Sequence, residues 1–526
     1  MIAADVLAAA LDAEGVDHVF GVPGEETEDL LFALRDAEVE FVPCRHEQGA
    51  AFMANVHGRL TGDAGVCLGT LGPGATNLVT GVADANLDKA PLVALTGQGA
   101  LERLHKESHQ AIDVVHLMEP VTKWNAQVSS PKIVHESVRK AFKVAEFEKP
   151  GATHLEVPED VAGSETSARP MAPKGRVRRP DPDEPSVDRV MDLLSTAERP
   201  LVIAGNGAVR TDAAGALRDF VEQTEIPVVS TYMGKGAVSD ADERSLLTLD
   251  SGDHQEASEA IGAADLVITV GYDIAEHDPA GWNPEAGTDV VHVDSQPAEV
   301  YEAYDPDVEV VCDVGAAVRA IVDRCDEVGA FDASWYRNLR EHIMADVTSP
   351  SDVDPFTVEA VLPILREHMA AEDVLVSDVG SHKMTIAQNF LTYEPNTVII
   401  SNGLASMGIA VPGGLAADLA VDANVVAATG DGGFLMNAAE LETANRLDAG
   451  YTVLLFNNDD YGLISAKQTD HRGESTGTAL GNPDFVAFAE SFGIEAARPE
   501  NWEELEGAFS RAIGSEDLSL IEVRVH

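Results

Sequence analysis

The chain has 526 residues, of which 45% are hydrophobic and 24% charged, so it is long enough for several globular domains with large cores. Its 90 Asp and Glu outnumber its 35 Lys and Arg, which gives a formal net charge of −55. Acidity spread along the whole chain disfavours nucleic acid or an anionic membrane as a partner and is typical of proteins that work in concentrated salt. There is no signal-peptide pattern and no uninterrupted apolar run of about 18 residues. We therefore expect a cytoplasmic protein without a membrane span.

Residues 1–166 alternate between short apolar runs and helical segments, which is the pattern of a parallel α/β sheet. The strand candidates are 18–24, 40–44, 64–74, 90–98 and 152–160. The four cysteines have no metal-ligand spacing, and Cys67 is expected to be a small core residue. A stretch with five prolines and no period, 167–186, is predicted to be a linker.

A second alternating block, 187–330, has strand candidates at 199–209, 226–238, 264–273 and 289–300. Its segment "GNGAVR" (205–210) resembles half of a dinucleotide-binding loop. Because the third glycine of that motif is missing, a tight strand-to-helix turn is the favoured interpretation.

A third block, 354–526, has strand candidates at 373–380, 396–403, 424–433, 451–458 and 518–526. The chain is therefore predicted to be an α/β protein with three doubly wound parallel-sheet domains.

In the third block, "GDGG" ends one strand and "NN" ends the next, with a helix expected over 437–449 between them. Asp431 and Asn458 would then lie just past the carboxyl ends of two parallel strands, about 4.8 Å apart if the strands are neighbours. One carboxylate, one amide oxygen and a glycine-rich turn suit Mg²⁺ holding a phosphate. An ordinary Asp-Gly turn at a polar strand end is the alternative.

Several motifs together identify a family. The chain carries "GDG" and "NN" in the third block, "RHEQGAAFMANVHGRLTG" (45–62), "LGPGATNLVTGVADANLDKAPLVALTGQ" (71–98), "HQAIDVVHLMEPVTKWN" (109–125), "SDVGSHKM" (377–384) and "SNGLASMGIAVPGG" (401–414). In the order in which they occur along the chain, these motifs resemble the large, catalytic subunit of acetolactate synthase, in the thiamine-diphosphate-dependent superfamily. The resemblance covers nearly the whole chain.

The resemblance implies a pyrimidine-binding domain at 1–166, a central domain at 187–330 and a diphosphate- and Mg²⁺-binding domain at 354–526. It implies Mg²⁺ ligands from the side chains of Asp431 and Asn458 and the main-chain carbonyl of Asp460. Met407 matches the apolar wedge that bends the cofactor, and the backbone of Ala405 and Met407 would bond its aminopyrimidine. The other cofactor-binding positions implied are Ser381, His382, Gly430, Gly432, Gly433, Tyr461 and Gly462.

Glu47 matches the family's catalytic glutamate, which also binds the cofactor. A carboxylate bonded to the pyrimidine N1′ favours the imino tautomer, whose exocyclic nitrogen removes the thiazolium C2 proton. Without the other motifs, Glu47 would be interpreted as a helix-start carboxylate. Gln110 matches a catalytic-site glutamine. His109 beside it would contact substrate or would be a packed helix-start histidine.

The family's two FAD-associated runs are missing, so the chain resembles the FAD-independent branch, and FAD is not expected. The implied reaction decarboxylates pyruvate and joins the product to a second 2-oxo acid. Glu25 and Glu26 stand where the family has small residues, which leaves the acceptor open. The resemblance implies a homodimer or homotetramer with the cofactor between subunits. The alternatives are another thiamine-diphosphate 2-oxo-acid decarboxylase or carboligase, a non-catalytic partner and a nicotinamide dehydrogenase.

Overall fold

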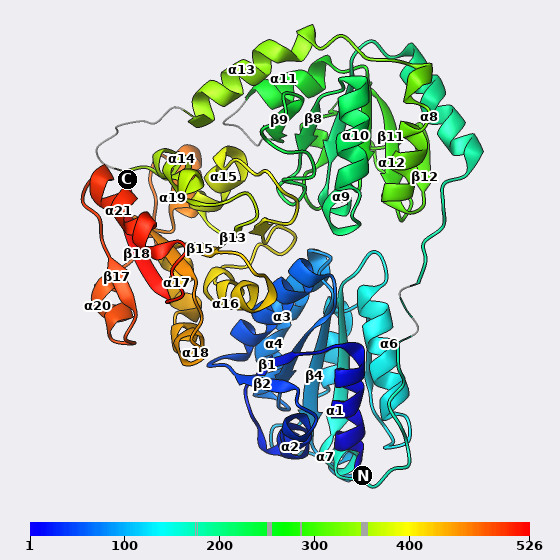
Figure 1. Cartoon of the computed structure of the whole chain (residues 1–526). Helices are drawn as coiled ribbons and strands as arrows, with labels where there is room; N and C mark the ends of the chain where they lie inside the picture. Colours follow the sequence, from blue (N-terminus) through cyan, green and yellow to red (C-terminus); the bar gives the residue numbers. More distant parts are fainter. Residues whose placement is uncertain (174, 176, 250–254, 285–286, 349–355, 526) are drawn as a thin grey trace.

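The computed structural model describes residues 1–173, 175, 177–249, 255–284, 287–348 and 356–525. The expected start of the third domain at residue 354 and its end at 526 lie outside the described residues, as do two positions of the expected linker, 174 and 176. The described chain forms three six-stranded sheets with helices on both faces, and neighbouring strands run parallel (Figure 1). The predicted fold class is confirmed.

The first sheet has the strand order β2-β1-β3-β4-β6-β5. Its strands are β1 (His18–Gly21), β2 (Glu40–Pro43), β3 (Gly65–Gly69), β4 (Leu92–Gln98), β5 (Trp124–Gln127) and β6 (Ala152–Pro158). Helices α1 (Ala3–Glu14), α2 (Glu28–Asp36), α6 (Val134–Glu146) and α7 (Glu159–Ala162) share a core on one face. Helices α3 (Glu47–Thr61), α4 (Pro73–Leu87) and α5 (Val114–Met118) contribute to the core on the other face.

The second sheet has the order β12-β11-β10-β7-β8-β9. Its strands are β7 (Pro200–Ala204), β8 (Val228–Ser230), β9 (Ser245–Thr248), β10 (Leu266–Val270), β11 (Asp289–Asp294) and β12 (Val308–Val311). Its helices are α8 (Glu184–Thr196), α9 (Asn206–Arg210), α10 (Ala214–Thr224), α11 (Gln255–Ala263), α12 (Val314–Val322) and α13 (Ser334–Thr348).

The third sheet has the order β14-β13-β15-β16-β18-β17. Its strands are β13 (Val374–Ser377), β14 (Val398–Ile400), β15 (Val425–Gly430), β16 (Thr452–Asn457), β17 (Glu495–Ala497) and β18 (Ser519–Arg524). Its helices are α14 (Val358–His368), α15 (Ser381–Asn389), α16 (Ala410–Ala420), α17 (Asp431–Asn437), α18 (Glu440–Arg446), α19 (Gly462–Arg472), α20 (Phe485–Glu490) and α21 (Trp502–Ala512).

The helix expected over 437–449 is wrong in its bounds. The chain is already helical at Asp431, and the helix is interrupted between Asn437 and Glu440. The glycines of "GDGG" favoured a turn, but an acidic first helical residue is stabilised by the helix macrodipole. Four strands were also missed, namely β5, β9, β12 and β17, and each lies at a sheet edge. Edge strands are short and need no continuous apolar run, so their sequence signal is weak.

The first and third domains share one hydrophobic core, in which α3 packs against α16 (Figure 1). Small residues allow the close approach: a β-carbon at Gly413 of α16 would lie 3.0 Å from side-chain atoms of both Val56 and Val376. This packing fixes the helix that begins with Glu47 against the third domain. Among the described residues, no helix is long and apolar enough to cross a membrane.

Candidate active site

Glu47 is the first residue of α3, and its side chain is only 8% exposed. Asn77, one turn into α4, donates a hydrogen bond to its carboxylate (Nδ2–Oε2, 2.9 Å). A β-carbon at Gly74 would lie 3.3 Å from Glu47 Oε1, so the first turn of α4 lies against the carboxylate. A helix-start carboxylate of this kind would ordinarily be solvated; here it is buried and held from a second helix.

Gln110 lies beside the same turn. Its backbone has a φ of +55°, and a β-carbon at Gly72 would lie 2.5 Å from its carbonyl oxygen. The side chains of Gln110 and His109 are exposed, and α5 begins only at Val114, so a packed helix-start histidine at position 109 is wrong. The structure thus brings Gln110 and Glu47 to one turn, 72–74.

The acidic residues Glu25 and Glu26, which replace small residues of the family, differ in their surroundings. Glu25 is exposed, whereas Glu26 accepts a hydrogen bond from Thr70 (Oγ1–Oε2, 2.8 Å) just after β3. Glu26 is therefore part of the same strand-end region and is held in place by a neighbour.

In the third domain, Asp431 and Asn458 directly follow β15 and β16, which are parallel neighbours with Gly430 opposite Phe456. The expected meeting of the two strand ends is therefore correct. Asp431 is 2% exposed, and burial raises the pKa of its carboxyl group. The Nδ2 of Asn482 donates to Asp431 Oδ2 (2.6 Å), Asp459 Oδ1 (2.9 Å) and Asn457 Oδ1 (3.1 Å).

Close glycine contacts gather the other cofactor-binding candidates of this domain. A β-carbon at Gly462 would lie 2.9 Å from Asn458 Nδ2 and 3.3 Å from Ser381 Oγ. A β-carbon at Gly432 would lie 2.6 Å from the ring of Tyr461, and one at Gly430 would lie 3.2 Å from the ring of His382. Only backbone without side chains therefore fits between these groups.

His382 and Asp378 are the buried polar groups at this strand edge. Burial lowers the pKa of His382 to about 4, so its imidazole is neutral, and its Nε2 has no hydrogen-bond partner among the described residues. Asp378 accepts from Gly408 N (2.7 Å) and from Thr429 Oγ1 (2.9 Å). The "SDVGSHKM" motif contains Asp378, but sequence reasoning assigned a role only to Ser381 and His382.

Ala405 and Met407 lie on a loop, 401–408, that is shaped from two domains. Ala405 has a φ of +54°, which is uncommon for a residue with a β-carbon and needs support from its surroundings. Through its bonds with Gly408 and Thr429, Asp378 ties the end of this loop to the end of β15.

The other end of the loop is held by the first domain. Ser401 Oγ donates to Asp84 Oδ1 (2.6 Å), and Gly403 N donates to Asp88 Oδ1 (2.6 Å). Arg59 donates to the carbonyl of Ile400 (2.7 Å). No local sequence signal identifies this role of Asp84 or Asp88, because their partners in the loop lie more than 300 positions away along the chain.

The oxygen donors at the ends of β15 and β16 fit Mg²⁺, which prefers hard oxygen ligands and few carboxylates. Asp431 and Asn458 would supply a carboxylate and an amide oxygen. Three oxygen acceptors, from Asp431, Asn457 and Asp459, converge on the amide nitrogen of Asn482 beside this position. In the described part of the chain, no three His, Cys, Asp or Glu side chains form a metal-binding group. The expected site needs only one such side chain.

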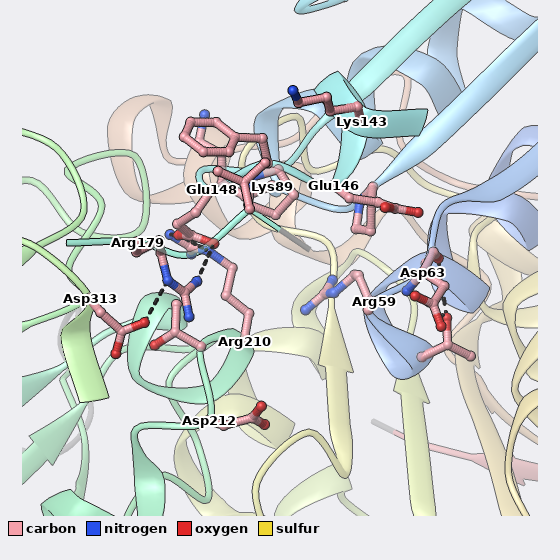
Figure 2. Close-up of a pocket in the computed structure, with 18 of the residues that line it drawn as sticks. Arg59, Asp63, Lys89, Lys143, Glu146, Glu148, Arg179, Arg210, Asp212 and Asp313 are labelled. Atoms are coloured by element: carbon pink, nitrogen blue, oxygen red, sulfur yellow. Dashed lines mark hydrogen bonds and ion pairs between the residues drawn. The ribbon is translucent and has the colours of Figure 1, made fainter. Parts of the chain in front are cut away.

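A large cavity lies elsewhere, between the first domain, the linker and the second domain, with Pro395 and Asn396 of the third domain also in its lining (Figure 2). It has a volume of about 1140 Å³, and no predicted site residue lines it. Ion pairs cross it: Arg210 with Glu148 (2.8 Å) is largely buried, and Arg179 with Asp313 (2.6 Å) is partly exposed. Its lining includes Arg59, Lys89, Arg139, Lys143, Arg178, Arg179, Arg210 and Arg319.

Three family models match the chain, one for each sheet. They are described as the N-terminal TPP binding domain (residues 1–117), the central domain (187–321) and the C-terminal TPP binding domain (378–523) of thiamine pyrophosphate enzymes. The chain is therefore a thiamine pyrophosphate (thiamine diphosphate) enzyme.

Individual relatives identify the family within the thiamine pyrophosphate enzymes. The chain is 32% identical to an acetolactate synthase of Bacillus subtilis (strain 168), over 99% of this chain and 93% of the relative. It is 32% identical to the acetolactate synthase isozyme 2 large subunit of Escherichia coli (strain K12), over 98% of this chain and 94% of the relative. A catabolic acetolactate synthase of Raoultella terrigena is 30% identical over 99% and 94%. The chain belongs to the acetolactate synthase family, and the matched thiamine pyrophosphate enzyme domains support a carboligase that depends on this cofactor.

The raised pKa of Asp84, which accepts from Ser401, predicts how thermal stability depends on pH. Burial and the neighbouring Asp88 raise the pKa of Asp84 from its ordinary 3.8 to about 8. Between these two pKa values the folded state holds a proton that the unfolded state has lost, so the stability is fully present below about pH 4, falls as pH rises toward about 8 and is constant above it. We expect the Tm of the wild type to fall more steeply than that of Asp84→Asn between about pH 5 and about pH 8. Thermal melts at constant high salt measure this, with the exposed Asp12→Asn of α1 as control. Parallel profiles would contradict it.

Proposed function

We propose that the chain is a Mg²⁺- and thiamine-diphosphate-dependent acetolactate synthase. It decarboxylates pyruvate and condenses the remaining two-carbon unit with a second 2-oxo acid. The names of the relatives support this reaction. The observation that carries the proposal is the pairing of a buried, Asn77-bound Glu47 in the first domain with the oxygen donors of Asp431 and Asn458 in the third.

In this proposal the domains span 1–166, 187–330 and 354–526. The first binds the cofactor's pyrimidine, and the third binds Mg²⁺ and the diphosphate. When bound, thiamine diphosphate supplies a carbon nucleophile and an electron sink for decarboxylation.

The chain's own residues do the rest. Asp431, Asn458 and the carbonyl of Asp460 would hold the metal, and the backbone of Ala405 and Met407 would orient the aminopyrimidine. Glu47 holds and releases a proton at the pyrimidine N1′. Gln110 lies where a bound 2-oxo acid could be contacted.

We propose a homodimer or homotetramer in which the first domain of one subunit faces the third domain of another. Glu47 has its hydrogen-bond partner within its own domain, as does Asp431. Large apolar side chains are exposed beside the third-domain half of the site, namely Leu404, Leu435, Met436 and Ile464. A second subunit would bury them, as interface cores do.

We propose that the protein works without FAD. The α9 segment, which resembled half a dinucleotide loop, has its first backbone N–H bonded to a buried carboxylate (Asn206 N to Glu276 Oε1, 3.0 Å). Thr231 also donates to Glu276. A carboxylate therefore occupies the position where a dinucleotide phosphate would bind a helix start. This observation also weighs against a nicotinamide dehydrogenase.

Another thiamine-diphosphate-dependent 2-oxo-acid decarboxylase or carboligase is the second candidate. The observation that favours it is the acidic pair Glu25 and Glu26, since Glu26 is bonded to Thr70, just after β3 and close in sequence to residues 72–74. A carboxylate there would disfavour some 2-oxo-acid acceptors. We further propose a cytoplasmic location. The substrates found in the assay below will distinguish a catabolic from a biosynthetic role.

Assay of the full-length protein with Mg²⁺ and thiamine diphosphate against a panel of 2-oxo acids tests the function. We expect 2-acetolactate from pyruvate, and a loss of about 100-fold or more in kcat for Glu47→Gln, because an amide accepts from N1′ but cannot carry its proton. Glu28→Gln, at the exposed start of α2, is the matched control. An active Glu47→Gln enzyme, or a flavin released on denaturation, would contradict the assignment.

Asp431→Ala is expected to weaken binding of the cofactor itself. The diphosphate is tied to the protein through the metal, so losing the carboxylate should reduce affinity by about tenfold or more. Calorimetric titration with thiamine diphosphate and Mg²⁺ measures it. Asp470→Ala, an exposed change on α19, serves as control, and equal affinity in the two variants would exclude the metal site.

The net charge of −55 predicts a need for salt. Below about 0.3 M salt, self-repulsion of an acidic surface should loosen the proposed subunit interface before the chain unfolds. Activity and mass by light scattering should therefore fall together on desalting, and Mg²⁺ with thiamine diphosphate should protect both. A protein that stays assembled and active in dilute buffer would show that its acidity is no adaptation to brine.

A further inference from the structure

Glu440 is a buried carboxylate whose partners belong to another domain. It is the first residue of α18 in the third domain, and it is 1% exposed. Its Oε1 accepts from the backbone N–H of Arg45 (3.0 Å) and of His46 (3.0 Å), the two residues before Glu47. Thr443 Oγ1 donates to its Oε2 (2.6 Å), which fixes the carboxylate from its own helix.

The position of this carboxylate explains a small residue in α3. A β-carbon at Gly49 would lie 2.7 Å from Glu440 Oε1, so any larger residue would displace the carboxylate. The backbone N–H groups at and before a helix start lack partners within the helix. Glu440 supplies an acceptor for two of them and places a negative charge at the positive end of the α3 dipole.

Because this contact is buried, losing it would cost folding free energy. A carboxylate out of water is costly unless it is fully hydrogen-bonded, and a buried N–H left without an acceptor is also costly. Burial raises the pKa of Glu440, while the bonds from Thr443, His46 and Arg45 favour its charged form. The start of α3 and the start of α18 are therefore held as one unit.

We propose that Glu440 is a positioning residue for Glu47: it fixes the backbone immediately before Glu47 and so sets where that carboxylate points. The inference rests on the proposed catalytic role of Glu47. Asn77 holds the carboxylate of Glu47, and Glu440 holds the backbone just before Glu47.

Glu442 provides a matched control on the same helix. It lies two residues further along and also contacts Arg45, but through the arginine side chain (Nε–Oε2, 2.7 Å) at the surface, where its own side chain is 28% exposed. An exposed pair of this kind contributes little to stability. Removing Glu442 therefore changes the charge of α18 without removing an acceptor from the backbone before Glu47.

Hydrogen exchange of the full-length protein, measured by mass spectrometry without cofactor, tests the contact directly. In Glu440→Ala we expect the amides of 45–46 to exchange about tenfold faster or more. Glu440→Gln keeps an acceptor oxygen in the same place and should restore protection, and Glu442→Ala should match the wild type. Unchanged exchange in Glu440→Ala would overturn the proposal.

Kinetics test the consequence. Glu440→Ala should lose about tenfold or more in kcat, and its affinity for thiamine diphosphate with Mg²⁺ should stay within about threefold of the wild type. Glu440→Gln should recover most of the kcat, and Glu442→Ala should be unaffected. If Glu440→Gln protects the amides of 45–46 but has a kcat as low as that of Glu440→Ala, the proposal that Glu440 positions Glu47 is overturned. A wild type without carboligase activity would instead refute the proposed function, and the exchange data would still decide the contact.

Discussion

The close packing of α3 against α16 is the constraint on which the rest of the structure depends. Glycine and alanine on both helices let the first and third domains share one core, with Gly413 against Val56 at the contact. Because dispersion and hydrophobic burial act over this contact, the two domains of one chain behave as a single packed body. Polar groups at its border can then be placed accurately enough to shape loops and helix starts across the domain boundary.

Carboxylates of each domain accept hydrogen bonds from the other domain at this border. Asp84 and Asp88 of the first domain hold the start of the 401–408 loop in the third. Glu440 of the third domain holds the backbone before Glu47 in the first. Each half of the candidate site is therefore shaped by the other domain of the same chain, although we propose that the cofactor itself joins halves from different subunits.

Local patterns predicted what depends on neighbours in sequence. The apolar runs gave the central strands, and the turns after β15 and β16 gave the meeting of Asp431 and Asn458, because a short crossover usually joins adjacent parallel strands. Edge strands such as β5 and β17 were missed, since they are short and only partly buried. Asp378, Asp84 and Glu440 were missed because their partners are brought near by tertiary packing, which leaves no periodic or motif signal.

The cavity between the first two domains bears on how the composition of the chain can change over evolution. Within the described part of the chain, eight Lys and Arg line that cavity, and some neutralise buried acids, as Arg59 does for Asp88 and Arg210 for Glu148. An exposed lysine can be exchanged for an acid with little effect on folding, but exchanging one of these arginines would leave a buried charge without a counter-ion. The interior of the domain junction, rather than the surface, thus sets a ceiling on how acidic this sequence can become.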